Sequence, residues 1–144
     1  MATFAADEKT RLLDELTKSY EEASHWSGYN QGWDILFKVL VLVLSLATTV
    51  LSLISANTHD APPVLATASA VLAGIVTLVS AFAFSTFDFA TRQRGWTTKA
   101  NAWRALIDQL NFAEPDKKQF LARKGDVHAY NADRGGELKP WQPA

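Results

Sequence analysis

Two long apolar segments, residues 35–56 and 64–87, constrain the fold of this chain more than any other feature. They contain 22 and 24 residues, and a helix of about 20 apolar residues crosses a hydrocarbon core about 30 Å thick. The connection between them, residues 57–63, is too short for anything but an antiparallel hairpin. The sequence therefore predicts an all-α membrane protein built on a two-transmembrane helical hairpin.

A soluble helical bundle is the main structural alternative, because its buried helices are also apolar. Such helices normally have charged residues along at least one face, whereas the only charge within the two segments is Lys38. Lys38 lies near the edge of the first segment, where a long side chain can extend to the lipid headgroups. A cleaved signal peptide is not expected, since acidic and aromatic residues precede the first segment instead of a short basic leader.

The distribution of basic residues predicts the orientation of the hairpin. The chain has 14 Lys and Arg residues, and none of them lies in the loop at residues 57–63. By the positive-inside rule, both termini face the cytoplasm and the loop faces outward. We therefore expect a multi-pass protein of the inner (plasma) membrane. The net charge of −1 argues against nucleic acid as a partner, because that would require clustered basic residues.

Helical periodicity outside the hairpin divides the chain into parts. Leu12, Leu16 and Tyr20 share one face of a predicted amphipathic helix, while Gly28 and Gly32 weaken helical continuity and predict a bend. Four parts follow: a cytoplasmic or interfacial helix at 1–33, the hairpin at 34–88 with spans 35–56 and 64–87, a cytoplasmic helical region at 89–124, and an irregular tail at 125–144.

A narrow apolar seam is predicted after the second span, which we expect to continue without a break to about residue 111. Pro115 ends this helix, because a helix rarely continues through the residue before a proline. We expect this seam to pack against one of three surfaces: the apolar face at residues 12–20, a neighbouring subunit or a cytoplasmic partner. A shorter helix at about 116–124 should stop at Gly125, and Trp141 in the tail is either docked or disordered. The seam consists of Trp96, Ala100, Trp103, Ile107 and Leu110.

Small and hydroxylated residues gather on one face of each span, taking 100° of rotation per residue. Such faces either allow close helix packing or line a wet pore. Charged residues at the cytoplasmic edge either form a selectivity ring or anchor the hairpin at the interface. The candidate pore-lining residues are Ser45, Thr48, Thr49, Ser52 and Ser55; the candidate packing residues are Ala66, Ala70, Gly74, Thr77 and Ala81; the candidate mouth residues are Asp34, Lys38 and Asp88.

Enzymatic and metal-binding functions are not predicted. His25, His59 and His128 are scattered along the chain and form no recognisable metal-ligand spacing. The chain has no cysteine, which excludes thiolate ligands and cysteine nucleophiles. No phosphate-binding glycine motif or GxSxG motif is present, so we expect neither catalysis nor a cofactor. His59 and Asp60 are interpreted as an ordinary polar loop rather than a cation site.

The arrangement resembles the SLATT family of bacterial two-transmembrane effectors, which are associated with SMODS nucleotidyltransferases and SLOG sensors. The resemblance covers residues 10–113 approximately and depends on Tyr20, Trp26, Trp96, Ala100 and Trp103 around the two spans. It implies a helical pore-forming effector of an antiphage or conflict system. This chain departs from the fused architectures because it has neither a nucleotidyltransferase nor a sensor domain. The resemblance then implies a separately encoded synthase or sensor, or direct ligand binding.

Two functional hypotheses remain open from the sequence. The first is a homo-oligomeric pore or ion channel, or another membrane-disrupting effector, in contact with the lipid bilayer. The alternative is a non-conducting membrane anchor or scaffold that recruits a cytoplasmic partner through Trp96, Trp103 and the tail. A cation-coupled transporter is not supported, because no acidic residue lies in the middle of either span.

Overall fold

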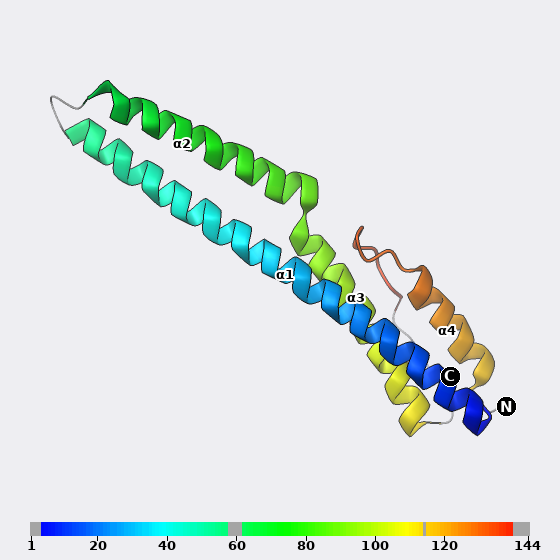
Figure 1. The fold of residues 1–144 in the computed structure, drawn as a ribbon. Coiled ribbons are helices and arrows are strands. Elements are labelled where there is room, and N and C mark those ends of the chain that lie inside the picture. The colour runs from blue at the N-terminus through cyan, green and yellow to red at the C-terminus, as the bar shows by residue number, and fades with distance from the viewer. Residues whose placement is uncertain (1–3, 58–61, 114, 140–144) are drawn as a thin grey trace. The chain divides into compact units, whose positions relative to one another are not determined.

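The chain is helical throughout most of its length. A computed structural model describes residues 4–57, 62–113 and 115–139, with residues 84–86 as backbone alone. Within these ranges no strand occurs, which confirms the all-α prediction. The elements are α1 (Ala6–Asn57), α2 (Pro63–Ala81), the π-helix η1 (Phe82–Phe87), α3 (Phe89–Phe112) and α4 (Lys117–Ala129) (Figure 1).

These elements belong to two compact units, and α1 contributes to both of them. The hairpin unit is Gln31–Phe89, close to the predicted hairpin at 34–88. The helical unit comprises Met1–Asn30 and Ala90–Ala144. The N-terminal arm, the region after the hairpin and residues 125–139 of the tail thus pack largely within one unit, although the sequence divides them into separate parts. The prediction for Trp141 lies outside the described residues.

Local sequence signals explain where the helices begin and end. Pro63 is the first residue of α2, where its missing N–H costs no helical hydrogen bond. Asp116 caps α4, because its side chain accepts a hydrogen bond from the Gln119 backbone N–H at 3.3 Å. Helix α3 ends at Phe112, shortly before Pro115, as the sequence predicts.

Glycine does not end either helix in which a weak point was predicted. Helix α1 is continuous through Gly28 and Gly32, and the bend expected there stays a prediction. The predicted stop at Gly125 is wrong, because α4 passes it and ends at Ala129. Glycine within a helix costs about 1 kcal/mol relative to alanine, and burial of a nearby apolar residue can outweigh so small a cost. In α4, Val127 lies after Gly125 and is fully buried, so extending the helix buries an additional apolar side chain.

The predicted unbroken passage from the second span into the next helix is also wrong. The π-helix η1 follows α2, and Asp88 then adopts a left-handed conformation with φ 39° and ψ 55°. Aspartate tolerates this conformation better than most residues. Phe87 and Phe89 stack at 5.5 Å with an interplanar angle of 6°, and Phe89 also stacks on Phe37 at 5.6 Å. Residues two apart in an α-helix face opposite sides, so this stack requires the break at Asp88.

The helical unit has its own hydrophobic core between α1, α3 and α4. Leu16 of α1, Leu106 of α3 and Phe120 of α4 are almost completely buried in it. Phe4 packs edge-on against Phe120 with ring centroids 5.4 Å apart. Lys117 of α4 lies 2.7 Å from a carboxylate oxygen of Glu8 in α1. Burial of the apolar faces, more than such exposed ion pairs, stabilises this unit.

Candidate membrane hairpin and its two polar faces

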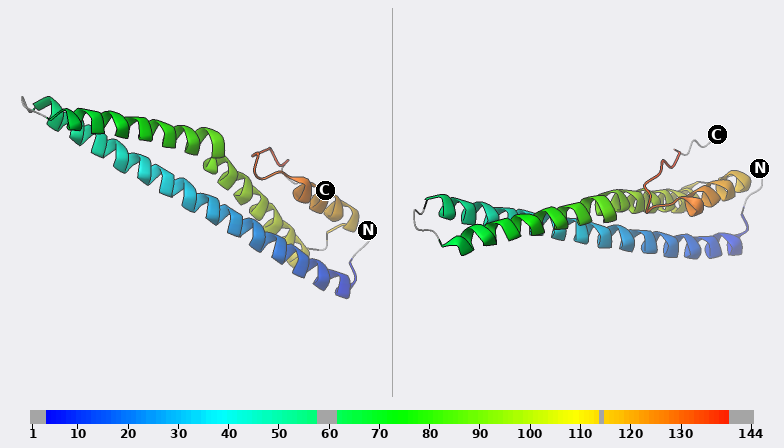
Figure 2. Two further views of the ribbon diagram at one scale, coloured as in Figure 1. Left: turned by 45° about the horizontal axis from the view of Figure 1, so that its top comes forward. Right: turned by 90° about the horizontal axis from the view of Figure 1, so that it is seen from above.

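The hairpin unit consists mainly of two antiparallel helices, the C-terminal part of α1 and α2 (Figures 1 and 2). Helices α1 and α2 are each long and apolar enough to cross a membrane. Large aliphatic side chains cover the outer surface of this unit, among them Leu42 and Leu46 of α1, which are 70% and 67% exposed. An outer surface of this kind suits contact with lipid and is unfavourable in water.

The hydroxyl face of α1 is turned toward α2 at Ser52. The Ser52 hydroxyl lies 2.6 Å from the hydroxyl of Ser69 in α2, within hydrogen-bonding distance. Thr48 donates to the Leu44 carbonyl oxygen at 2.8 Å and Thr49 to the Ser45 carbonyl oxygen at 2.9 Å. These hydroxyls therefore have partners within the chain. The remaining candidates, Ser45 and Ser55, are half-buried.

The small-residue face of α2 does not pack against α1. Its members are all exposed: Ala66, Ala70, Gly74, Thr77 and Ala81. The half-buried face of α2 contains Leu65, Ser69, Leu72, Val76 and Val79, which recur at helical spacing on the side that bonds to Ser52. A packing role for the small residues consequently remains a prediction about contact with another chain.

The three charged residues predicted at the membrane edge differ in their surroundings. Lys38 donates a hydrogen bond to Asp34 at 2.6 Å, one helical turn away. Paired opposite charges produce a weaker field than an isolated charge, which favours interfacial anchoring over a selectivity ring for this pair. Asp88 occupies the left-handed position between η1 and α3. Its role at a pore mouth stays a prediction.

The apolar seam of α3 lies in the core of the helical unit. Ala100, Trp103 and Leu110 are 6% exposed or less and share this core with Leu12 and Leu16 of α1. Trp96 and Ile107 pack against the same cluster and are half-buried. The seam is therefore mostly occupied within the chain, which leaves little of it for a cytoplasmic partner.

Sequence analysis did not identify the contribution of α4 and the segment after it to this unit. Phe120 and Val127 are seven residues apart in α4, and both are fully buried. Their spacing was a usable signal for one buried face. Leu138 also packs against the core, although nothing in its surrounding sequence indicates burial.

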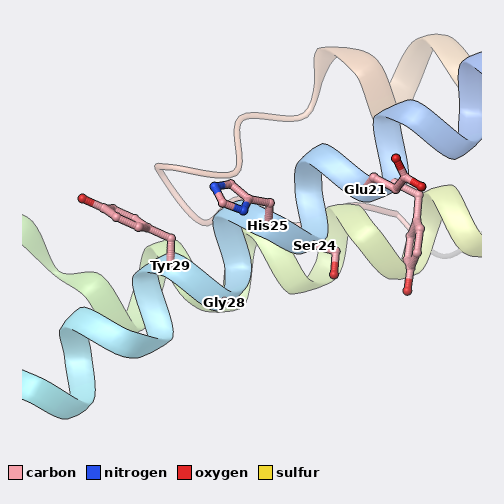
Figure 3. A pocket seen from close by; sticks show the side chains of 6 residues that line it. Glu21, Ser24, His25, Gly28 and Tyr29 are labelled. Atoms are coloured by element: carbon pink, nitrogen blue, oxygen red, sulfur yellow. The ribbon is translucent and has the colours of Figure 1, made fainter.

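An open hollow of about 480 Å³ lies on the surface of α1 (Figure 3). Its lining includes Glu21, Ser24, His25 and Tyr29, all from this one helix. Because no second element closes it, a bound molecule would remain largely solvated, and the hollow offers no enclosed catalytic arrangement. Elsewhere on α1, the hydrogen bond and charge of Asp14 raise the pKa of the exposed Lys18.

Neither a group of metal ligands among the described residues nor a known relative indicates a functional class for this chain. Among the residues that the structure describes, no group of three His, Asp or Glu side chains is placed to hold a metal ion. The chain matches no protein-family model, no curated protein and no solved structure. The geometry of the hairpin unit is therefore the basis for a functional proposal.

Proposed function

We propose that this chain is a homo-oligomeric, pore-forming or membrane-disrupting effector. The observation that carries the proposal is the exposed small-residue face of α2, represented by Ala66, Ala70 and Gly74. Small residues at this spacing let two helices approach closely in a bilayer. Since the opposite side of α2 already contacts α1 through Ser69, the small-residue face is available to a second copy of the chain.

Opening of a pore would change the contact between the two spans. With Ser52 bonded to Ser69, the hydroxyl face of α1 contacts α2 at this position. A conducting state lined by this face requires that the contact be lost or exchanged between subunits. The structure thus supports a closed resting arrangement of the hairpin, from which a pore forms by rearrangement.

The cellular setting of this proposal comes from charge and from the SLATT resemblance. The absence of Lys and Arg from the 57–63 loop supports an inner-membrane protein with both termini in the cytoplasm. The resemblance supports a role in a bacterial nucleotide-signalled antiphage or conflict system. A separately encoded synthase or sensor then supplies the activating signal.

A non-conducting membrane anchor is the second candidate. The Ser52–Ser69 contact favours it, because this contact engages one hydroxyl of the candidate pore-lining face within the hairpin of a single chain. Burial of Trp103 and Leu110 in the helical unit argues against recruitment of a partner through the seam. An anchor would need a different recruiting surface.

Replacing Gly74 by leucine should weaken self-association. Gly74 is exposed with no heavy atom within 4 Å of an added Cβ, so the substitution leaves the single hairpin intact. Overpacking a helix contact costs about 1–3 kcal/mol, which corresponds to roughly fivefold to 150-fold weaker association. Cross-linking in liposomes measures the oligomer, and release of a trapped dye measures the pore.

The matched control is Val71→Leu, which adds bulk on the large-residue side of α2, where Val71 is 56% exposed. The control should keep both the oligomer and the dye release. An oligomer that persists in Gly74→Leu would exclude this face as the subunit contact. An intact oligomer without dye release, under conditions that activate the system in cells, would favour the anchor.

A further inference from the structure

The segment after α4 is held against the first turns of α3 by several specific contacts. Trp96 donates from its indole nitrogen to Asp133 at 3.0 Å, and Lys99 donates to the Tyr130 carbonyl oxygen at 3.2 Å. The Lys99 ammonium also lies 5.4 Å from the Trp96 ring centroid. Residues 130–138, which we name the latch segment, thus dock on α3 near the end of the described chain (Figure 1).

Gly95 is the position on α3 that permits this docking. It is buried, and a Cβ added there would overlap the Ala132 carbonyl oxygen and lie 2.8 Å from the Ala132 carbonyl carbon. Ala132 is 3% exposed. Backbone therefore packs directly on backbone, an approach that only glycine allows.

The latch segment is pre-shaped by its own hydrogen bonds. The Tyr130 hydroxyl donates to the Gly136 carbonyl oxygen at 2.9 Å, and Asn131 accepts from the Asp133 backbone N–H at 3.1 Å. Gly135 has a positive φ of 61° and lies beside Thr91 of α3. These local bonds and the left-handed glycine hold the turn that presents Ala132 to Gly95.

The two halves of α3 are stabilised in different ways. Its second half is buried in the core through Trp103, Leu106 and Leu110. Its first half is held on one side by α1. There Trp26 stacks on Trp96 with ring centroids 6.2 Å apart, and the hydroxyls of Ser27 and Thr97 are hydrogen-bonded at 2.7 Å. The latch segment holds it on another side, near Gly95. Loss of the contacts made by residues 130–136 would free one side of the first half and leave the buried second half in place.

We propose that the latch segment is an intramolecular restraint on α3, and that its release activates the hairpin unit. The restrained turns begin at Thr91, three residues after the left-handed Asp88 that ends η1. In this proposal, a motion of the first half of α3 reaches α2 along the chain, through the break at Asp88. The regulatory part of this inference rests on the proposed function, whereas the restraint itself does not.

Gly95→Ala tests the restraint in the full-length chain. Alanine favours the helix, but its Cβ displaces Ala132. The backbone amides of residues 130–136 should therefore exchange hydrogen at least about tenfold faster than in the unaltered chain. The amides in the buried second half of α3 should stay protected. Gly125→Ala is the matched control, because its added Cβ has no heavy atom within 4 Å. The combined variant Asp133→Ala with Tyr130→Phe removes latch bonds without altering α3 and should have the same effect.

Dye release from liposomes measured on the same variants tests the regulatory role. We expect Gly95→Ala and the combined variant to release dye several times faster than the unaltered chain and Gly125→Ala. Unchanged exchange at 130–136 would overturn the restraint. Faster exchange with unchanged release would overturn the regulation, although release from the unaltered chain under activating conditions would still support the pore. If no variant released dye under any condition, the regulation would fail together with the proposed function.

Discussion

Replacing Phe120 by alanine should lower the free energy of unfolding of the helical unit by about 3–5 kcal/mol. Phe120 is completely buried between α1, α3 and α4, and its ring packs edge-on against Phe4. Truncation removes this burial and leaves a cavity that the rigid helices cannot fill. Urea unfolding in detergent, followed by tryptophan fluorescence, to which the buried Trp103 contributes, measures the effect.

Leu121→Ala is the matched control for this prediction. Leu121 is the next residue of α4 and is 41% exposed, so its loss should cost less than about 1 kcal/mol. Equal destabilisation by the two substitutions would show that α4 does not pack through Phe120. The helical unit would then have a different core from the one described.

Replacing Leu46 by aspartate should prevent stable insertion of the first span. Leu46 is 67% exposed near the centre of the apolar part of α1. Aspartate at the centre of a membrane helix costs about 2.5–3.5 kcal/mol on insertion scales, or roughly a hundredfold in the insertion equilibrium. The fraction of the chain that resists carbonate extraction from membranes measures the change.

Thr17→Asp provides the comparison, because Thr17 is exposed on the part of α1 that belongs to the helical unit. A surface substitution there should change stability by less than about 0.5 kcal/mol and leave the membrane fraction unchanged. Similar behaviour of the two variants would contradict a lipid-facing position for Leu46.

The features that sequence analysis predicted correctly depend on local signals. The apolar segments and the helix-ending Pro115 act through residues adjacent in sequence, so the pattern alone predicts where these helices lie. The break at Asp88 was missed because it accompanies the stacking of Phe89 on Phe37, a residue of another helix. A helical wheel contains no information about such distant partners.

The same limit applies to the candidate site. Periodicity identified a hydroxyl face on α1 and a small-residue face on α2, but not which of them meets the other helix. The structure brings Ser52 to Ser69 and leaves Ala70 and Gly74 exposed. Docking of Ala132 against Gly95 is equally non-local, and a glycine within an amphipathic helix was its only signal.

The central claim is that the hairpin crosses a lipid bilayer twice, with its loop and its termini on opposite sides. Because the chain has no cysteine, single cysteines can be introduced at the exposed Asn57 and Lys118 and labelled in intact cells with a membrane-impermeant maleimide. The account predicts labelling of Asn57→Cys but not of Lys118→Cys until the membrane is permeabilised. Equal labelling of both variants before permeabilisation, or recovery of the protein in the soluble fraction without detergent, would contradict it.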